Sequence, residues 1–125
     1  MKAESLINEA AEAPRPVTPN DVAEFQAILS GYLEDIHREH RAKMSGIDFK
    51  LEMMVGIKYT RIVKSEYDKR DGKPITRSAY GFIDMTNGNL LKAASYAQPA
   101  KGARGNIFAK NPLEGCQPYG MAYLR

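Results

Sequence analysis

Cysteine is nearly absent from this chain of 125 residues, and long apolar runs are missing altogether. Cys116 is the single cysteine, so no disulfide can form within the chain, and a reducing compartment is the simplest expectation. No apolar run approaches the length of a membrane-spanning helix, and the N-terminal residues lack the sustained apolar segment of a secretory signal. We therefore expect a cytoplasmic protein that makes no use of a membrane.

Motifs of the common enzyme classes are missing as well. The chain has no G-x-S-x-G, no P-loop, no G-x-G-x-x-G and no metal-binding motif. His37 and His40 lie three residues apart with Glu34 just before them, a spacing that can hold a metal, but no further histidine or cysteine joins them. A polar helix end is the better interpretation of this group. We expect no enzyme, no metal site and no cofactor.

Charge is distributed unevenly along the chain. The net charge is only +3, which by itself does not establish a polyanionic partner. Residues 1–56, however, hold six cations against ten acids, whereas residues 57–125 hold twelve against five. No acid lies between Asp84 and Glu114. An uninterrupted basic segment of this kind is typical of a groove that follows a phosphate backbone.

The first half of the chain predicts a helix followed by a strand. Thr18-Pro19-Asn20-Asp21 is a good helix start, and apolar residues then recur every three or four positions up to Ile36. From Ile47 to Tyr59 every second residue is apolar, which predicts one long half-buried strand with a bulge at Gly56. Residues 1–17 are expected to be an N-terminal arm, either flexible or docked, ahead of a single domain of residues 18–125.

The second half predicts antiparallel hairpins. Asp71-Gly72 and the Thr86–Asn89 segment, which contains Asn-Gly, are turn signals between apolar runs. They delimit strands over 77–85 and 90–95, and one or two short strands follow, over 106–108 and 119–124. The predicted fold is α+β, with one long amphipathic helix packed on a twisted antiparallel β-meander of three to five strands.

The segment "SYAQPAKGARGNIF", residues 95–108, concentrates the residue types that bind a phosphate backbone. Its glycines allow a close backbone approach, its cations supply charge, its aromatic rings can stack on bases, and its asparagine can contact a base edge or hold the loop itself. A solvated basic turn is the alternative interpretation. With two neighbouring cations included, the candidate nucleic-acid-binding residues are Arg77, Lys92, Tyr96, Lys101, Gly102, Arg104, Gly105, Asn106 and Phe108.

Cations on the predicted sheet extend this basic segment. Lys58, Arg61 and Lys64 are expected to join Arg77 across the exposed face of the sheet. Tyrosines occur close to them in the sequence, but a tyrosine at such a position is more often a core or edge residue, and we expect Tyr59 to be in the core.

Residues 80–108, "YGFIDMTNGNLLKAASYAQPAKGARGNIF", together with "YTRIVK" at 59–64, resemble small proteins encoded by tailed bacteriophages. In those proteins a similar hairpin precedes a K-A-A-S-like segment and a P-A-K-x-A-R-G-N-I-F-like segment. The resemblance covers about half of the chain. It implies a location in the cytoplasm of an infected bacterium, and it carries over no catalytic or binding residue.

Two functions remain open at this point. The first is a small phage-encoded protein that binds DNA or RNA, single-stranded or without sequence preference, through the basic glycine-rich segment. The second is a non-enzymatic interaction module, such as an inhibitor of a host or defence factor. Its working surface would be the acidic helix, or an arm whose Leu6 and Ile7 dock on a host protein or on a second copy of the chain.

Overall fold

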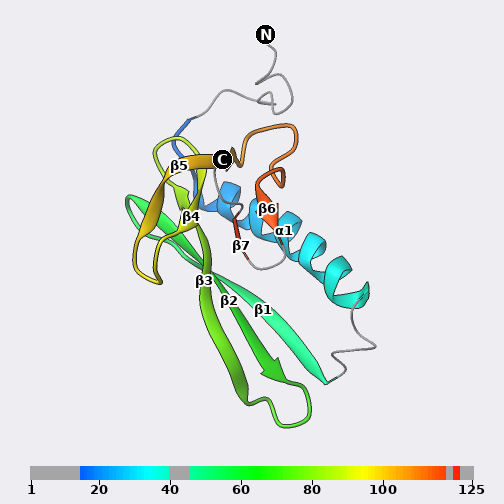
Figure 1. The fold of residues 1–125 in the computed structure, drawn as a ribbon. Coiled ribbons are helices and arrows are strands. Elements are labelled where there is room, and N and C mark those ends of the chain that lie inside the picture. Colours follow the sequence, from blue (N-terminus) through cyan, green and yellow to red (C-terminus); the bar gives the residue numbers. More distant parts are fainter. Residues whose placement is uncertain (1–14, 40–45, 118–119, 122–125) are drawn as a thin grey trace.

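The structure is a computed structural model that describes residues 15–39, 46–117 and 120–121 (Figure 1). It contains one helix, a five-stranded antiparallel sheet in which the strands follow chain order, and a small separate hairpin. The elements are α1 (Pro19–Glu39), β1 (Ile47–Met54), β2 (Tyr59–Asp68), β3 (Pro74–Asp84), β4 (Asn89–Ala93), β5 (Pro99–Asn106), β6 (Cys116–Gln117) and β7 (Gly120–Met121). The α+β class and the five-stranded meander are thus confirmed. The long helix is confirmed only in part, because α1 has 21 residues and more of the described chain lies in strands.

Helix α1 begins where the sequence predicts. The backbone N–H of Asp21 donates to Thr18 Oγ1 at 3.2 Å, and the N–H of Thr18 donates to Asp21 Oδ2 at 2.9 Å, which is a reciprocal cap of the first turn. Arg15 donates to both carboxylate oxygens of Asp21, at 2.7 and 3.0 Å. That pairing holds the pKa of Asp21 at about 2, below its usual 3.8. Residues 15–17 of the predicted arm therefore contact the domain, and residues 1–14 lie outside the described chain.

One face of the sheet carries the hydrophobic core. The helix contributes the buried side chains of Phe25, Leu29 and Leu33, as its spacing predicts. They join a cluster of strand residues that includes Ile62 and Ile83. Residues of the β6–β7 hairpin belong to the same cluster, so α1 and this hairpin cover the same face of the sheet, which we call the inner face (Figure 1). The opposite face is called the outer face.

The connection between β1 and β2 corrects one prediction. The alternating residues from 47 to 60 do not form one strand, because β1 ends at Met54 and the chain turns back into β2 at Tyr59. Gly56 lies in this turn rather than at a bulge. A Cβ at Gly56 would stand 2.6 Å from the Tyr59 carbonyl oxygen, so only glycine fits so close an approach. The alternation of apolar residues continues across the turn, so the turn cannot be recognised from the sequence.

The two predicted hairpin turns are confirmed. Gly72 connects β2 to β3 with φ +71°, and Gly88 connects β3 to β4 with φ +83°. Between them β3 carries a bulge, since Ile62 pairs with Gly81 while Val63 pairs with Ala79. The unpaired residue is Tyr80, whose ring is buried in the core cluster with the helix. Tyr80 is thus a core residue, which is the more common role of a tyrosine that lies close to cations of a sheet in the sequence.

The C-terminal hairpin is tied to the inner face by polar contacts. The Tyr80 hydroxyl donates to the Gln117 carbonyl oxygen, and Tyr32 donates to the Cys116 carbonyl oxygen at 3.3 Å. Cys116 pairs with Met121 across the hairpin and is buried, and burial raises the pKa of its thiol to about 11. Burial likewise raises the pKa of the Tyr80 hydroxyl. No helix within the described residues combines the length and the apolar character that a membrane span requires.

Candidate functional site

The predicted basic loop is an edge strand of the sheet. Residues 99–106 form β5, which pairs with β4 through an irregular register: Leu90 lies opposite Gly105 and Leu91 opposite Ala103. Arg104 falls between these pairs, and its Nη1 donates to the carbonyl oxygens of Lys101 and Gly102, at 2.7 Å each. The expectation of a loop is wrong here, because these bonds let the glycine-rich segment pair as a bulged strand.

Gly102 adopts a left-handed conformation, with φ +92°, at the bulge that Arg104 braces. Unpaired carbonyl groups on an edge strand invite pairing with other chains, so a guanidinium that occupies two of them protects the edge. Gly105 has a partner in the ladder and is half-buried. The glycines and Arg104 thus have a structural role in an edge strand, whereas the alternative interpretation of the segment placed them in a solvated basic turn.

Three further candidates are engaged within the fold. Lys92 Nζ donates to the Met121 carbonyl oxygen at 2.9 Å and so holds β7 against β4. Asn106 donates to the Asn87 carbonyl oxygen at 2.9 Å and accepts from the backbone N–H of Phe108 at 2.8 Å, so it holds the turn rather than a base. Phe108 is only 5% exposed. The prediction that its ring stacks on a base is wrong, because that ring is buried.

The remaining candidates are exposed, and two of them meet. Lys101 and Gly102 are exposed on β5. Tyr96, in the β4–β5 connection, is 42% exposed and its ring lies 5.9 Å from the Arg77 guanidinium carbon. Arg61 is closer still, with its guanidinium carbon 4.6 Å from the centre of the Tyr96 ring. The structure therefore brings Arg61, Arg77 and Tyr96 together, although they lie up to 35 positions apart in the sequence.

Strand pairing places this group on the outer face. Met54 lies opposite Arg61, Arg61 opposite Phe82, and Phe82 opposite Leu91. Directly opposed residues of antiparallel strands share a face, and the neighbouring row through Ile62 points to the helix. The row through Arg61 therefore faces away from α1.

Three hydrogen-bond donors converge on the sulfur of Met54. Arg61 Nη1 lies 3.6 Å from Met54 Sδ, and Arg77 Nη2 and the Tyr96 hydroxyl each lie 3.8 Å from it. A thioether is a weak acceptor. Arg77 has one acid nearby, Glu52, at 3.5 Å, but both side chains are nearly half exposed, so this pair contributes little. We call Arg61, Arg77 and Tyr96 the donor cluster.

Arg61 has no carboxylate partner within the described part of the chain. Its Nε is buried and makes no hydrogen bond there. The guanidinium carbon lies 6.0 Å from the Phe82 ring centre, and the residue as a whole is half-buried. A buried donor without an acceptor costs on the order of 1–3 kcal/mol. The described residues thus supply this cation with aromatic neighbours and a sulfur but with no anion.

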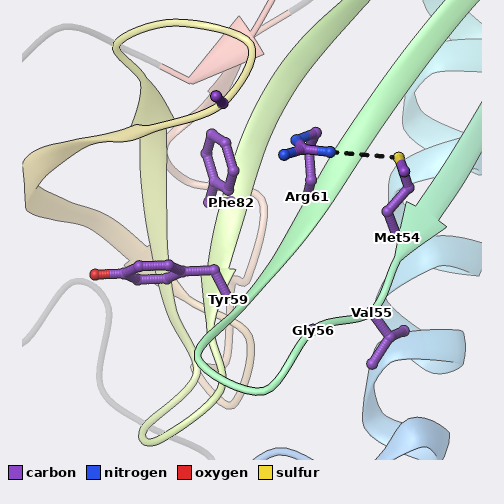
Figure 2. Close-up of a pocket in the computed structure, with 7 residues that line it drawn as sticks. Met54, Val55, Gly56, Tyr59, Arg61 and Phe82 are labelled. Atoms are coloured by element: carbon purple, nitrogen blue, oxygen red, sulfur yellow. Dashed lines mark hydrogen bonds between the residues drawn. The ribbon is translucent and has the colours of Figure 1, made fainter.

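A pocket of about 360 Å³ adjoins the donor cluster. Figure 2 shows Arg61 between the Phe82 ring and Met54, with Tyr59 on the side where β2 begins. Tyr59 and Phe82 meet edge to face, with ring centres 6.3 Å apart. Tyr59 is half-buried and lines the pocket, so the expectation of a core residue is wrong. We call this space the Arg61 pocket; its lining residues are Met54, Val55, Gly56, Tyr59, Arg61, Phe82 and Ala97.

The rim of the pocket combines charge and apolar surface. Lys58 is exposed, and its ammonium lies 5.4 Å from the Tyr59 ring centre. Ile57 is fully exposed and Val55 is 56% exposed. Lys64, which the sequence grouped with these cations, lies 5.7 Å from the ring of Phe49, which packs against the core cluster of the inner face. Lys64 therefore does not extend the outer-face cluster.

The histidine group of the sequence does not form a metal site in the described residues, where no cluster of three or more potential ligands occurs. His37 Nε2 lies 2.7 Å from the Ile47 carbonyl oxygen and its ring packs against Phe49 at 5.7 Å. It thus connects the end of α1 to the start of β1. His40 lies outside the described residues.

Comparison with known proteins identifies a family. Residues 9–119 match the model of a family described as Family of unknown function (DUF7717), and the chain belongs to that family. The match spans every element from α1 to β6. No curated protein and no solved structure matches the chain. The family supplies no substrate or reaction, so a function has to be argued from the geometry of the outer face.

Proposed function

We propose that this member of DUF7717 binds single-stranded nucleic acid on the outer face of its sheet. The observation that carries the proposal is the convergence of Arg61, Arg77 and Tyr96 on the sulfur of Met54. Two guanidinium groups and a hydroxyl within 4 Å of one weak acceptor form a set of donors that a phosphate oxygen satisfies far better.

The chemistry around the donor cluster favours a nucleic acid over a simple anion. Single-strand-binding surfaces combine cations that follow the backbone with aromatic rings that stack on bases. Here Tyr96 and Tyr59 present partly exposed rings beside the cations. Lys58 extends the positive charge along the rim of the Arg61 pocket. The resemblance to phage-encoded proteins, which suggests a bacterial host cytoplasm, is compatible with such a role.

Salt-dependent binding tests the proposal. Fluorescence anisotropy is measured with labelled single-stranded DNA, duplex DNA and single-stranded RNA, each across a salt series. A single-strand contact to one phosphate contributes about 0.7 to the slope of log affinity against log salt. Replacing two contacts, in the double variant Arg61→Gln with Arg77→Gln, is expected to flatten the slope by about 1.4.

The matched control is the double variant Lys69→Gln with Arg70→Gln. It removes the same charge from the exposed turn between β2 and β3, where Arg70 pairs with Asp68 of the same hairpin. Binding by this control is expected to stay close to that of the unmodified protein. Equal losses in the two double variants would show that only net charge matters and would refute the site. Absence of binding to all three probes at low salt would refute the function.

A protein partner is the second candidate, and the connection between β1 and β2 favours it. Ile57 is fully exposed and Val55 is 56% exposed, and neighbouring exposed apolar residues are typical of docking surfaces. The arm residues Leu6 and Ile7, which the sequence suggested for this role, lie outside the described chain. If a protein docks here, Ile57→Ser abolishes capture of that partner while nucleic-acid binding by the donor cluster is unchanged.

A further inference from the structure

We infer that the Arg61 pocket accepts one unpaired nucleobase and that this base is guanine. The inference rests on the proposed function, since it concerns the base next to a phosphate held by the donor cluster. The pocket adjoins that cluster and shares Arg61 and Met54 with it. A strand whose phosphate contacts Arg77 and Tyr96 therefore brings an adjacent base to the mouth of the pocket.

The size and walls of the pocket suit a single base. Its volume of about 360 Å³ lies at the lower end of the range for small-molecule sites, which is roughly 300–1,000 Å³. Val55 and Ala97 supply apolar surface, and Tyr59 supplies a partly exposed ring against which a base can pack. A base paired in a duplex cannot enter without leaving its partner, so the pocket favours single strands.

The polar character of the pocket selects among the bases. Among the described residues, Arg61 is the only charged one that lines it, and a guanidinium carries five N–H donors and no acceptor. Guanine presents two adjacent acceptors, O6 and N7, to which arginine binds as a fork. Adenine combines an acceptor with a donor on that edge, and thymine presents one acceptor beside a methyl group.

Arg61 serves the phosphate and the base with different N–H groups, since each terminal nitrogen of the guanidinium carries two of them. Its Nη1 faces the Met54 sulfur, where the donor cluster converges, and the guanidinium retains further donors for the pocket. The ring of Tyr96, 4.6 Å from the guanidinium carbon, and the ring of Phe82, 6.0 Å from it, restrict the orientation of the group. Restricting the arginine in the unbound protein reduces the entropy lost when the base binds.

The test compares thymidine oligonucleotides of about 12 nucleotides that carry one central guanine, adenine, cytosine or abasic site. Anisotropy is measured with the unmodified protein, so the first comparison depends on no variant. A central guanine is expected to raise the affinity about tenfold over a central adenine, in the lower part of the range for a bidentate arginine–guanine pair. Equal affinity for all four oligonucleotides, or an equal gain with cytosine, would overturn the assignment of guanine.

Arg61→Lys tests the role of the fork, because it keeps the charge and removes the planar pair of donors. This variant is expected to have a weaker guanine preference, because an ammonium replaces the planar fork, while its salt slope on plain thymidine stays unchanged. Arg77→Lys is the matched control and is expected to keep the preference. A guanine preference that is undiminished in Arg61→Lys would overturn the inference. Failure of all oligonucleotides to bind refutes the proposed function itself, whereas binding without base preference refutes only the guanine pocket.

Discussion

Lys92 separates the two interpretations of the basic segment. The sequence makes it a phosphate ligand, whereas in the structure its ammonium donates to the Met121 carbonyl oxygen at 2.9 Å. A hydrogen bond from a charged donor contributes about 1.5–3 kcal/mol, and the half-buried position of Lys92 places it near the lower end. Lys92→Met keeps the length of the side chain and removes the donor. We expect it to ease opening of the β6–β7 hairpin by about 1.5 kcal/mol.

Cys116 reports that opening, because it pairs with Met121 and its thiol is buried. Its pKa of about 11 and its burial make the native thiol almost unreactive toward iodoacetamide at neutral pH. Since 1.4 kcal/mol corresponds to a factor of ten, iodoacetamide is expected to label Cys116 about tenfold faster in Lys92→Met than in the unmodified protein. Lys101→Met, which changes an exposed lysine, is the control, and its Cys116 is expected to be labelled at the same rate as in the unmodified protein.

The opposite pair of results would refute this reasoning. If Lys92 is a phosphate ligand, Lys92→Met leaves Cys116 labelling unchanged and flattens the salt slope of nucleic-acid binding by about 0.7. The structural role predicts faster labelling and an unchanged slope. Labelling is compared with total stability from urea unfolding, so that a local opening is distinguished from global destabilisation.

Two further predictions concern the stability of the fold. Because the Arg15 pairing lowers the pKa of Asp21 from 3.8 to about 2, it stabilises the folded state above pH 3.8, and that contribution is lost as the pH falls toward 2. Unfolding in urea across this interval should therefore show a steeper loss for the unmodified protein than for Asp21→Asn, and equal slopes would contradict the pairing. Gly115→Ala would place a Cβ 2.0 Å from the Arg104 carbonyl oxygen and should lower the free energy of unfolding by about 3 kcal/mol. Gly31→Ala lies on the exposed side of α1, where a Cβ would meet no atom within 4 Å, and should raise the free energy of unfolding by about 1 kcal/mol. A Gly115→Ala variant as stable as the original would contradict the close contact.

Local signals of the sequence predicted most of the elements. The cap at Thr18, the apolar spacing along α1 and the turn at Gly88 each act over a few residues, and each is confirmed. The turn at Gly56 was missed because an apolar alternation that continues through a turn cannot be distinguished from a single strand. Strand β5 could not be predicted because glycines are typical of loops. Its bulged pairing is accompanied by hydrogen bonds from Arg104 to backbone carbonyl oxygens, and residue types do not indicate such bonds.

The site was predicted less well because it depends on pairing between strands. Tyr96 and Arg77 were candidates on residue type, and the structure brings them together. Arg61 was placed at the margin of the predicted surface, although it lies at the centre of the donor cluster. Its neighbour Met54 could not be predicted without the turn at Gly56, because that turn sets the register of β1 against β2.

The basic side chains of the candidate surface thus differ in the hydrogen-bond acceptors that surround them. Arg104 and Lys92 donate to backbone carbonyl oxygens of the described chain, and each bond has a structural purpose that residue type does not reveal. Arg61 is offered two aromatic rings and one sulfur, and its Nε is offered no acceptor there. Burying a polar group without an acceptor is unfavourable, and a charged group in such surroundings beside a pocket is a candidate binding group. Of these three cations, Arg61 is the one whose described partners include no oxygen acceptor, and this difference, rather than the number of basic residues, is the reason for placing the candidate site on the outer face.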